Sequence, residues 1–399
     1  MVEIALFAVM ALPDLNEKWE APFLAYAMVD RSCPAMILIG RDCFGVLQAT
    51  LCVARELMKK VTLRGKLVRA RFICLALCLF VLGAITVPGF ARAEKFIIAW
   101  SAVSALNSPF WVMNDAGLLK QEGLDMELVY IASSPTVARA TLAGDIVISG
   151  ANSQVIVDVG LNGGDLVAMG AITNVVAFYI MAAPEIKTVT DLRGKVVGVT
   201  RFGASTDFGM RMLLSKYGLE AAKDVPFIQI GGMPELAAAL SQKTVFAAPM
   251  SQPMVYLAQK AGMRMLANLA KEDIPFMHIG LTTSKRWIRE HRPQAKAFIR
   301  AYGRAIHFMH TRKEQTKAIF AKYTKINDMG MLDGSLQYGY DFMEKIPFVK
   351  AQAFQVTLDQ IARTNPKAKQ AKPEQFFDNS LVQELVDEGF FTKLWGKKP

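Results

Sequence analysis

From residue 95 onward, the sequence repeats one local order: a short apolar run, a turn rich in glycine, serine and proline, and then a stretch with helical spacing. This order is typical of a largely parallel sheet whose strands are joined by helices. The apolar runs predict strands at residues 96–100, 126–131, 146–148, 166–172, 178–182, 196–200, 227–230 and 245–248. The pattern therefore restricts the fold class to α/β.

The expected helices begin where polar caps follow these runs. Ser108 and Ser134 are each followed by proline, which suits the first turn of a helix because an N–H there would lack a partner. The loop 201–207 opens another helix, with apolar residues at i, i+3, i+4 and i+7 from Met210 to Tyr217. A similar order starts again near Asp191, so two units stand in tandem and predict two lobes that face one cleft.

Composition and charge exclude several classes of protein. Of the 399 residues, 52% are hydrophobic and 20% are charged, which excludes a disordered chain. The formal net charge of +11 is not gathered in a long basic run, so the sequence indicates no nucleic-acid partner.

The cysteines are unevenly placed. All five lie within the first 93 residues, namely Cys33, Cys43, Cys52, Cys74 and Cys78. The rest of the chain has no thiol for catalysis, for zinc or iron–sulfur ligation, or for a disulfide. No cofactor and no metal site are therefore expected there.

Residues 58–93 have the three parts of an export signal. Basic residues from Lys59 to Arg71 precede an apolar stretch at 72–87, and Ala91-Arg92-Ala93 supplies the small residues of a cleavage site. Cleavage after Ala93 would release a periplasmic protein. The alternative is a membrane anchor, for which 16 apolar residues are few.

Residues 1–57 precede this signal and show no sustained helical or strand period. We interpret them as a misassigned upstream start, and a real N-terminal extension is the alternative.

Four segments carry a family resemblance. They are 116–125 (AGLLKQEGLD), 142–146 (LAGDI), 191–199 (DLRGKVVGV) and 201–208 (RFGASTDF). In this order they resemble the substrate-binding proteins of ABC importers, in the nitrate, sulfonate, taurine and pyrimidine-precursor (SsuA-like) branch. The resemblance spans roughly residues 94–280. Lys243 and Phe246 depart from it, because relatives usually carry a glycine and an acidic residue in this segment.

The resemblance implies a two-lobed, type II periplasmic binding-protein fold, in which each lobe is a mainly parallel sheet flanked by helices. The first lobe is expected from residues 94–183 with part of 279–399, and the second from 184–278. Residues 286–399 are expected to be mostly helical. Two hinge connections are expected near 178–184 and 278–283.

The implied function is a monomeric receptor that binds a small solute between its lobes and delivers it to an ABC permease with its ATPase. Three alternatives stay open: pyrimidine-precursor binding, a synthase-like enzyme on the same fold, and a sensor protein that presents its ligand to a membrane partner. The sequence shows no catalytic motif and predicts no enzyme, because no nucleophile motif or pair of catalytic carboxylates stands out.

In open parallel sheets, ligands lie beyond the carboxyl ends of the strands, where loops lead into helix N-termini. Five loops meet this description: 101–108, 133–135, 150–153, 203–206 and 231–233. Unpaired amides and helix dipoles at such places suit an anion, so a small organic sulfonate or carboxylate is predicted. The candidate ligand-binding residues are Ser101, Asn107, Trp111, Asn152, Arg201, Phe202, Ser205, Thr206, Gly232 and Ser251.

These candidates have different expected roles. Arg201 is expected to pair with the anion, while Ser205 and Thr206 add hydroxyl donors. The polar candidates of the first lobe would orient the rest of the molecule, and Phe202 or Trp111 would cover an apolar part. The alternative for the serines is a plain capping role, and for the aromatic residues a place in the core.

Overall fold

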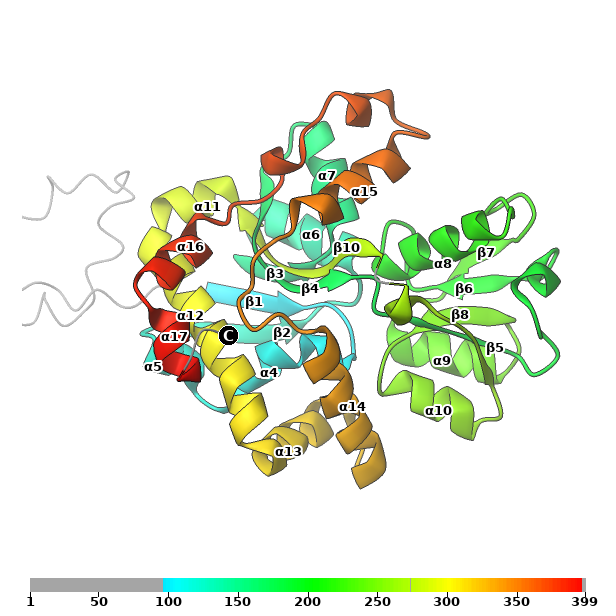
Figure 1. Ribbon diagram of the computed structural model, residues 1–399, viewed down its shortest axis with the longest axis horizontal. Helices are drawn as coiled ribbons and strands as arrows, with labels where there is room; N and C mark the ends of the chain where they lie inside the picture. Colours follow the sequence, from blue (N-terminus) through cyan, green and yellow to red (C-terminus); the bar gives the residue numbers. More distant parts are fainter. Residues whose placement is uncertain (1–95, 273, 397–399) are drawn as a thin grey trace, which may run out of the picture. The chain divides into compact units, whose positions relative to one another are not determined.

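The computed structural model describes residues 96–272 and 274–396, which belong to one compact unit, Arg92–Pro399. The predicted extension at 1–57, the signal at 58–93 and the cleavage after Ala93 lie outside the described residues. Within the described part, the chain forms two five-stranded sheets flanked by helices (Figure 1).

The first sheet has the strand order β2-β1-β3-β10-β4. Its strands are β1 (Phe96–Trp100), β2 (Met126–Tyr130), β3 (Ile148–Ala151), β4 (Leu166–Val175) and β10 (Pro275–Ser284). Strand β1 pairs in parallel with β2 and β3, whereas β10 runs antiparallel between β3 and β4. Four strands thus share one direction, and the inserted β10 opposes them.

Helices connect these strands. They are α4 (Ser108–Asp115), α5 (Leu118–Gln121), α6 (Ser134–Ala143) and α7 (Ser153–Leu161). The Ser-Pro pairs start α4 and α6, but Ser108 and Ser134 are the first helical residues, and the N-cap positions belong to Asn107 and Ser133. Gly144 ends α6 with φ 89°, a left-handed conformation that glycine adopts at no steric cost.

The second sheet repeats this plan with the order β7-β6-β8-β5-β9. Its elements are β5 (Tyr179–Ala182), β6 (Val197–Val199), α8 (Ser205–Lys216), β7 (Phe227–Gln229), α9 (Met233–Ser241), β8 (Ala247–Met250), α10 (Met254–Lys260) and β9 (Arg264–Asn268). Strand β6 is parallel to β7 and β8, while β5 runs antiparallel between β8 and β9. Both lobes therefore have the expected mainly parallel strand direction, with one reversed strand each.

The chain passes between the sheets earlier than predicted. It leaves the first sheet at 176–178, after β4, and returns between the end of β9 at Asn268 and the start of β10 at Pro275. The expected hinge ranges 178–184 and 278–283 instead hold β5 and most of β10. Thr282 and Thr283 interrupt the apolar run in sequence, yet both are fully buried, and the Thr283 hydroxyl donates to the Val147 carbonyl at 2.6 Å.

Other predicted bounds also shift. The third strand covers Ile148–Ala151 rather than 146–148, and β9 has no predicted counterpart because its first residues are exposed at a sheet edge. Tyr217 is 49% exposed, since α8 ends at Lys216 before its apolar face reaches that position.

A helical region follows β10. It contains α11 (Lys285–Glu290), α12 (Arg292–Thr311), α13 (Lys313–Thr324), α14 (Met329–Phe342), α15 (Ala351–Ile361), α16 (Ser380–Asp387) and α17 (Phe390–Trp395). Helix α12 packs on α4, and α15 packs on α7 and β10, so this region completes the first lobe (Figure 1).

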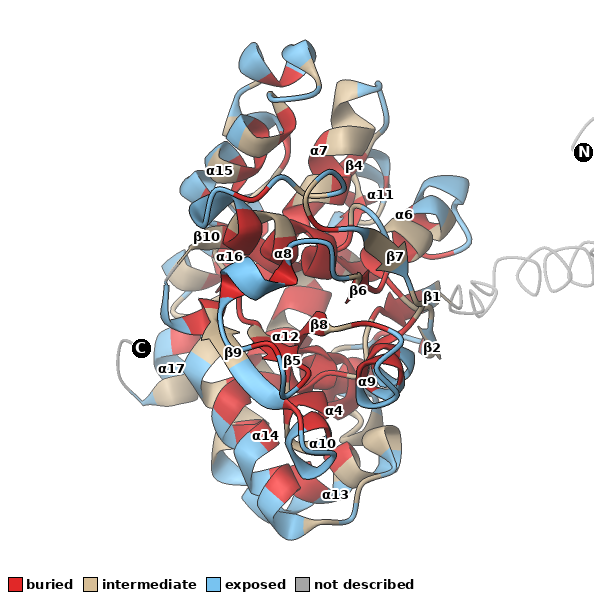
Figure 2. Cartoon of the chain, turned by 90° about the vertical axis from the view of Figure 1, so that its right-hand side faces the viewer, coloured by how far each residue is buried: buried red, intermediate tan, exposed pale blue. Residues whose placement is uncertain are grey.

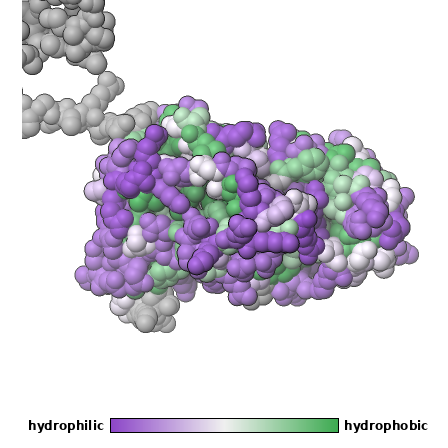
Figure 3. All heavy atoms as spheres, turned by 90° about the horizontal axis from the view of Figure 1, so that it is seen from above, coloured by the Kyte–Doolittle hydropathy of each residue, from purple (hydrophilic) through white to green (hydrophobic). Residues whose placement is uncertain are grey.

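Each sheet has its own apolar core, and buried residues follow the strands and the inner faces of the helices (Figure 2). Hydrophilic side chains predominate on the face in Figure 3, with apolar ones between them. Among the described helices, none is both long enough and apolar enough to cross a membrane.

Candidate functional site

A cavity of about 40 Å³ lies between the two lobes. Its lining residues are Ser101, Ala102, Ser104, Asn107, Ser133, Ser134, Phe178, Thr200, Ala204, Ser205, Thr206, Met233, Ser251, His278 and Ile279. Because a water molecule needs only about 10–15 Å³ by this measure, the cavity has room for a few small groups. Hydroxyl groups from both lobes predominate among its polar atoms.

Helix N-termini border this cavity. Ser134 is the first residue of α6, Ser205 of α8 and Met233 of α9. The N–H groups of a first turn have no acceptor within their helix, and the helix dipole places partial positive charge there. Three helices from two lobes therefore bring donor groups to one small space.

Asn107 supplies an unused donor. Its side chain is fully buried, and its Oδ1 accepts from the backbone N–H of Ser101 at 3.3 Å. Its Nδ2 has no hydrogen-bond partner within the described part of the chain. Gly150 leaves room for this amide, because a Cβ at that position would lie 3.3 Å from Asn107 Oδ1. A buried amide nitrogen without a partner is costly, and an acceptor atom of a bound molecule would satisfy it.

Ser133 has an uncommon backbone conformation beside the cavity. Its φ is 74°, although it is not glycine, and its N–H donates to the Ser101 carbonyl at 2.8 Å. Strained residues persist where their surroundings fix them, and they gather at binding sites.

His278 is the one titratable side chain in the cavity lining. Burial lowers its pKa to about 3, which outweighs a hydrogen bond with the Val175 carbonyl that favours the protonated ring. Its Nδ1 accepts from the N–H of Ala177 at 3.3 Å, and its ring lies 4.3 Å from that of Phe178. The histidine is therefore neutral at neutral pH, and no lining residue carries a charge.

The acidic group that follows Ser205 and Thr206 has a structural role. Asp207 Oδ2 accepts from the Gly203 N–H at 3.0 Å, and Oδ1 accepts from Arg211 Nε at 2.7 Å. Burial raises the pKa of Asp207, and these two partners partly offset the effect. The carboxylate thus fixes the loop before α8, as a capping group does.

Half of the predicted site residues come together here. Ser101, Asn107, Ser205, Thr206 and Ser251 all line the cavity.

Asn152 lies beside the cavity but does not line it. It caps α7, since its Oδ1 accepts from the N–H of Val155 at 2.9 Å. Its Nδ2 donates to the Gly203 carbonyl at 3.1 Å and to Ser205 Oγ at 3.2 Å, both in the other lobe.

Two candidates of the loop after β6 point elsewhere. Arg201 is exposed and Phe202 is 46% exposed. The Thr206 hydroxyl accepts from the Thr200 N–H at 3.0 Å and pairs with the Thr200 hydroxyl at 2.8 Å. This closure brings Thr200 and Thr206 to the cavity, whereas the side chains of Arg201 and Phe202 stay outside it.

The remaining two candidates are also outside the lining. Trp111 is fully buried in the core of the first lobe, with its ring stacked on Tyr323 at 5.1 Å. Gly232 lies near Tyr130, because a Cβ there would be 3.2 Å from the Tyr130 hydroxyl.

The sequence predicted the loops around the cavity more accurately than it predicted which side chains line the cavity. Three further lining residues lie in predicted loops, namely Ser104, Ser133 and Ser134. His278 was not predicted, because no neighbouring sequence feature indicates that its side chain lines a cavity. The predicted loop 150–153 contributes no lining residue.

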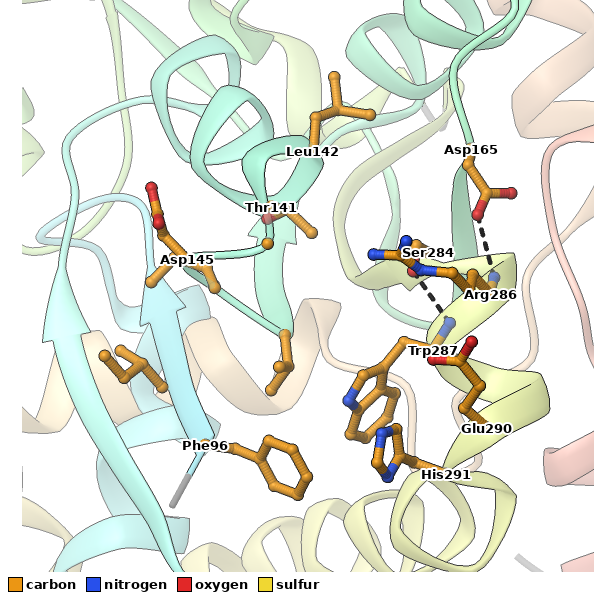
Figure 4. A pocket seen from close by; sticks show the side chains of 14 residues that line it. Phe96, Thr141, Leu142, Asp145, Asp165, Ser284, Arg286, Trp287, Glu290 and His291 are labelled. Atoms are coloured by element: carbon orange, nitrogen blue, oxygen red, sulfur yellow. Dashed lines mark hydrogen bonds between the residues drawn. The ribbon is translucent and has the colours of Figure 1, made fainter. Parts of the chain in front are cut away.

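A larger cavity of about 500 Å³ lies at the opposite end of the first sheet (Figure 4). Phe96, Trp287 and His291 form its aromatic side, with ring centroids 5.2–5.7 Å apart. It borders the start of β1 and the end of β10, away from the carboxyl ends of the parallel strands. Ligand sites of open α/β sheets lie at the other end, so the interlobe cavity is the better candidate.

No group of three or more His, Cys, Asp or Glu side chains suited to a metal ion exists within residues 96–272 and 274–396.

Comparison with known proteins places this chain in a family. The family model described as "NMT1/THI5 like" matches residues 107–316, more than half of the chain. The chain therefore belongs to the NMT1/THI5-like family. No curated protein matches it in sequence.

Several solved structures share the fold. A protein from Bordetella bronchiseptica RB50 has a TM-score of 0.67 at 19% identity, over 74% of this chain and 98% of that one. The alkanesulfonate-binding protein SsuA from Xanthomonas axonopodis pv. citri, bound to MOPS, has a TM-score of 0.59 at 17% identity, over 74% and 98%. The periplasmic nitrate-binding protein NrtA from Synechocystis PCC 6803 has a TM-score of 0.63 at 14% identity, over 74% and 89%. The chain thus has the two-lobed α/β fold of periplasmic binding proteins.

Proposed function

We propose that this protein is a periplasmic solute receptor that binds a small organic anion, of the sulfonate or carboxylate type, between its lobes. It would deliver this solute to an ABC permease as a monomer, without catalysing a reaction. The observation that carries the proposal is the unpartnered Nδ2 of Asn107, buried at a cavity that both lobes line with hydroxyls and helix N-termini.

The donor set favours an anion over a cation. The lining offers an amide N–H, several hydroxyls and the positive ends of three helix dipoles, and it holds no carboxylate. Because Arg201 lies outside the cavity, the anion would be held by neutral donors rather than by a side-chain cation.

The structural neighbours support an anionic solute. One of them is an alkanesulfonate-binding protein, and another is a nitrate-binding protein. Their low identity leaves the particular solute of this chain open, since one fold serves many ligands.

A thermal-shift panel tests the proposal. It contains nitrate, taurine, longer alkanesulfonates, aliphatic and aromatic carboxylates, and neutral pyrimidines as controls. A solute at 100 times its Kd stabilises the folded protein by about 2.7 kcal/mol, which raises the melting temperature measurably. We expect at least one sulfonate or carboxylate to do so. A shift with neutral pyrimidines alone contradicts the anion, and no shift with any compound contradicts a receptor for this class.

A further inference from the structure

Direct hydrogen bonds join the two lobes beside the cavity, and Asn152 makes two of them. Its Nδ2 donates to the Gly203 carbonyl at 3.1 Å and to Ser205 Oγ at 3.2 Å. We propose that Asn152 is a positioning residue that latches the lobes closed and sets the rate of solute entry without touching the solute. The effect on solute entry rests on the proposed function, whereas the latch itself does not.

The amide nitrogen of Asn152 has no spare N–H for an anionic solute. The side chain is fully buried, and its Oδ1 is engaged by the N–H of Val155 at 2.9 Å. Both bonds from its Nδ2 end on the opposite lobe. A solute that bound this side chain would have to break a bond that already exists, so its contribution is to lobe closure.

The latch continues through Ser205 into the first sheet. Ser205 Oγ accepts from Asn152 and donates to the carbonyl of His278, on β10, at 3.0 Å. Ser205 opens α8 of the second lobe, so the N-terminus of this helix is tied to the first lobe at two points. Buried side-chain networks of this kind hold one geometry when every member is satisfied.

Other contacts join the lobes on a different path. Ser251 Oγ donates to Ser104 Oγ at 2.8 Å, and the backbone N–H of Ala105 donates to the Gln252 carbonyl at 2.9 Å. Because these contacts do not involve Asn152, its loss should weaken closure without abolishing it.

The link between Ala105 and Gln252 is a natural reporter of closure. The N–H belongs to the first lobe and its acceptor to the second, so this amide is protected from exchange only while the lobes are in contact. The N–H of Ile131, which donates to the Trp100 carbonyl at 3.1 Å within the first lobe, is the matched internal control.

Asn152→Asp separates the latch from the helix cap. An aspartate caps a helix as well as an asparagine does, so the bond from Val155 persists. It has no N–H to donate, however, and its carboxylate would face the Gly203 carbonyl. Asn152→Ala removes both functions, and Asn162→Asp, at the exposed end of the same helix, adds the same charge away from the cleft.

The test is residue-resolved hydrogen exchange of the full chain by NMR, with no solute added. We expect Asn152→Asp to speed the exchange of the Ala105 amide at least about tenfold, because two hydrogen bonds between the lobes are lost, and to leave the Ile131 amide unchanged. Asn162→Asp should change neither.

Two outcomes overturn the latch. If the exchange rate of the Ala105 amide is unchanged in Asn152→Asp, Asn152 acts only as a helix cap. If exchange at Ala105 and at Ile131 is accelerated equally, the substitution destabilises the whole fold. Because the experiment contains no solute, a failed solute panel leaves it intact. If a solute is found, Asn152→Asp should also speed its association several-fold, since entry requires an open cleft; an unchanged association rate contradicts this part of the proposal.

Discussion

The side chain of Asn107 is buried at the interlobe cavity with its oxygen in use and its nitrogen unpaired. Asn107→Asp keeps the acceptor for the Ser101 N–H and replaces the free donor with a carboxylate oxygen. The loss of one hydrogen bond to a charged group costs about 1.5–3 kcal/mol. We therefore expect anion binding to weaken at least tenfold, as measured by titration calorimetry with the best anion of the panel.

The control for this substitution is Asn162→Asp, which adds the same charge at the exposed C-cap of α7. Wild-type affinity or tighter binding of this anion in Asn107→Asp would show that the solute does not use this amide.

Arg201 tests whether a side-chain cation holds the solute. It is exposed and outside the cavity lining, although its place after β6 predicts an anion contact from sequence. Surface substitutions usually change free energies by less than about 0.5 kcal/mol. We expect Arg201→Ala to change the Kd for the anion by less than about threefold. A tenfold or greater loss of affinity would show that Arg201 contacts the solute.

Asp158 gives the protein a pH-dependent stability. Burial raises its pKa to about 6 from an ordinary value of 3.8. The folded state therefore disfavours the carboxylate, and this penalty grows as the pH rises from about 4 to 6 and persists above 6. Asp158→Asn should raise the melting temperature at pH 7.5, and most of the gain should disappear at pH 4. An equal gain at both pH values would contradict this origin.

At the scale of elements, Glu122 forms ion pairs that link the helical region after β10 to the rest of the first lobe. It follows α5 and is 93% buried as a side chain, and it accepts from Arg300 Nε and Arg304 Nε of α12, each at 2.6 Å. Removal of the carboxylate leaves two partly buried guanidinium groups unpaired. We expect Glu122→Ala to lower the free energy of unfolding by about 1–3 kcal/mol, measured by chemical denaturation.

Solute binding should be unaffected by this change, because Glu122 is not among the residues that line the cavity. Glu122→Gln, which keeps the shape of the side chain, should lose less stability than Glu122→Ala. Equal stability of Glu122→Ala and wild type would show that these ion pairs contribute nothing.

Short sequence patterns predicted the elements whose position depends on residues close together in the chain. The Ser-Pro pairs that open α4 and α6 and the apolar runs of β1 and β2 appear where expected. The reversed strand β10 does not follow from its own residues, because Thr282 and Thr283 are buried only by strands far away in sequence. The second hinge range is misplaced for the same reason, since it depends on where β10 begins.

The same limit applies to the site. Parallel strand ends correctly indicated most loops around the cavity, and Ser101, Asn107 and Ser205 lie in them. Whether a loop residue points inward depends on how the loop closes, as the bond between Thr200 and Thr206 decides for Arg201. The sequence pattern of the loop does not predict this hydrogen bond.

At the scale of the whole molecule, export should remove the first part of the chain. Protein from the periplasmic fraction should begin at Glu94, as determined by N-terminal sequencing or intact mass, because residues 91–93 match the small-residue pattern of a cleavage site. Retention of residues 72–87 would contradict cleavage and favour a membrane anchor.

A disulfide that can be formed and reduced across the cleft tests whether a solute binds between the lobes. Ser104 and Ser251 face each other across the lobes with hydroxyl oxygens 2.8 Å apart, so a cysteine at each position could form a disulfide. The described residues contain no other cysteine, and each single substitution controls for the change of side chain. We predict that the reduced double variant binds the best panel anion, that the oxidised one does not take it up, and that reduction restores binding. Equal uptake of the anion by the oxidised and reduced forms would contradict a site between the lobes.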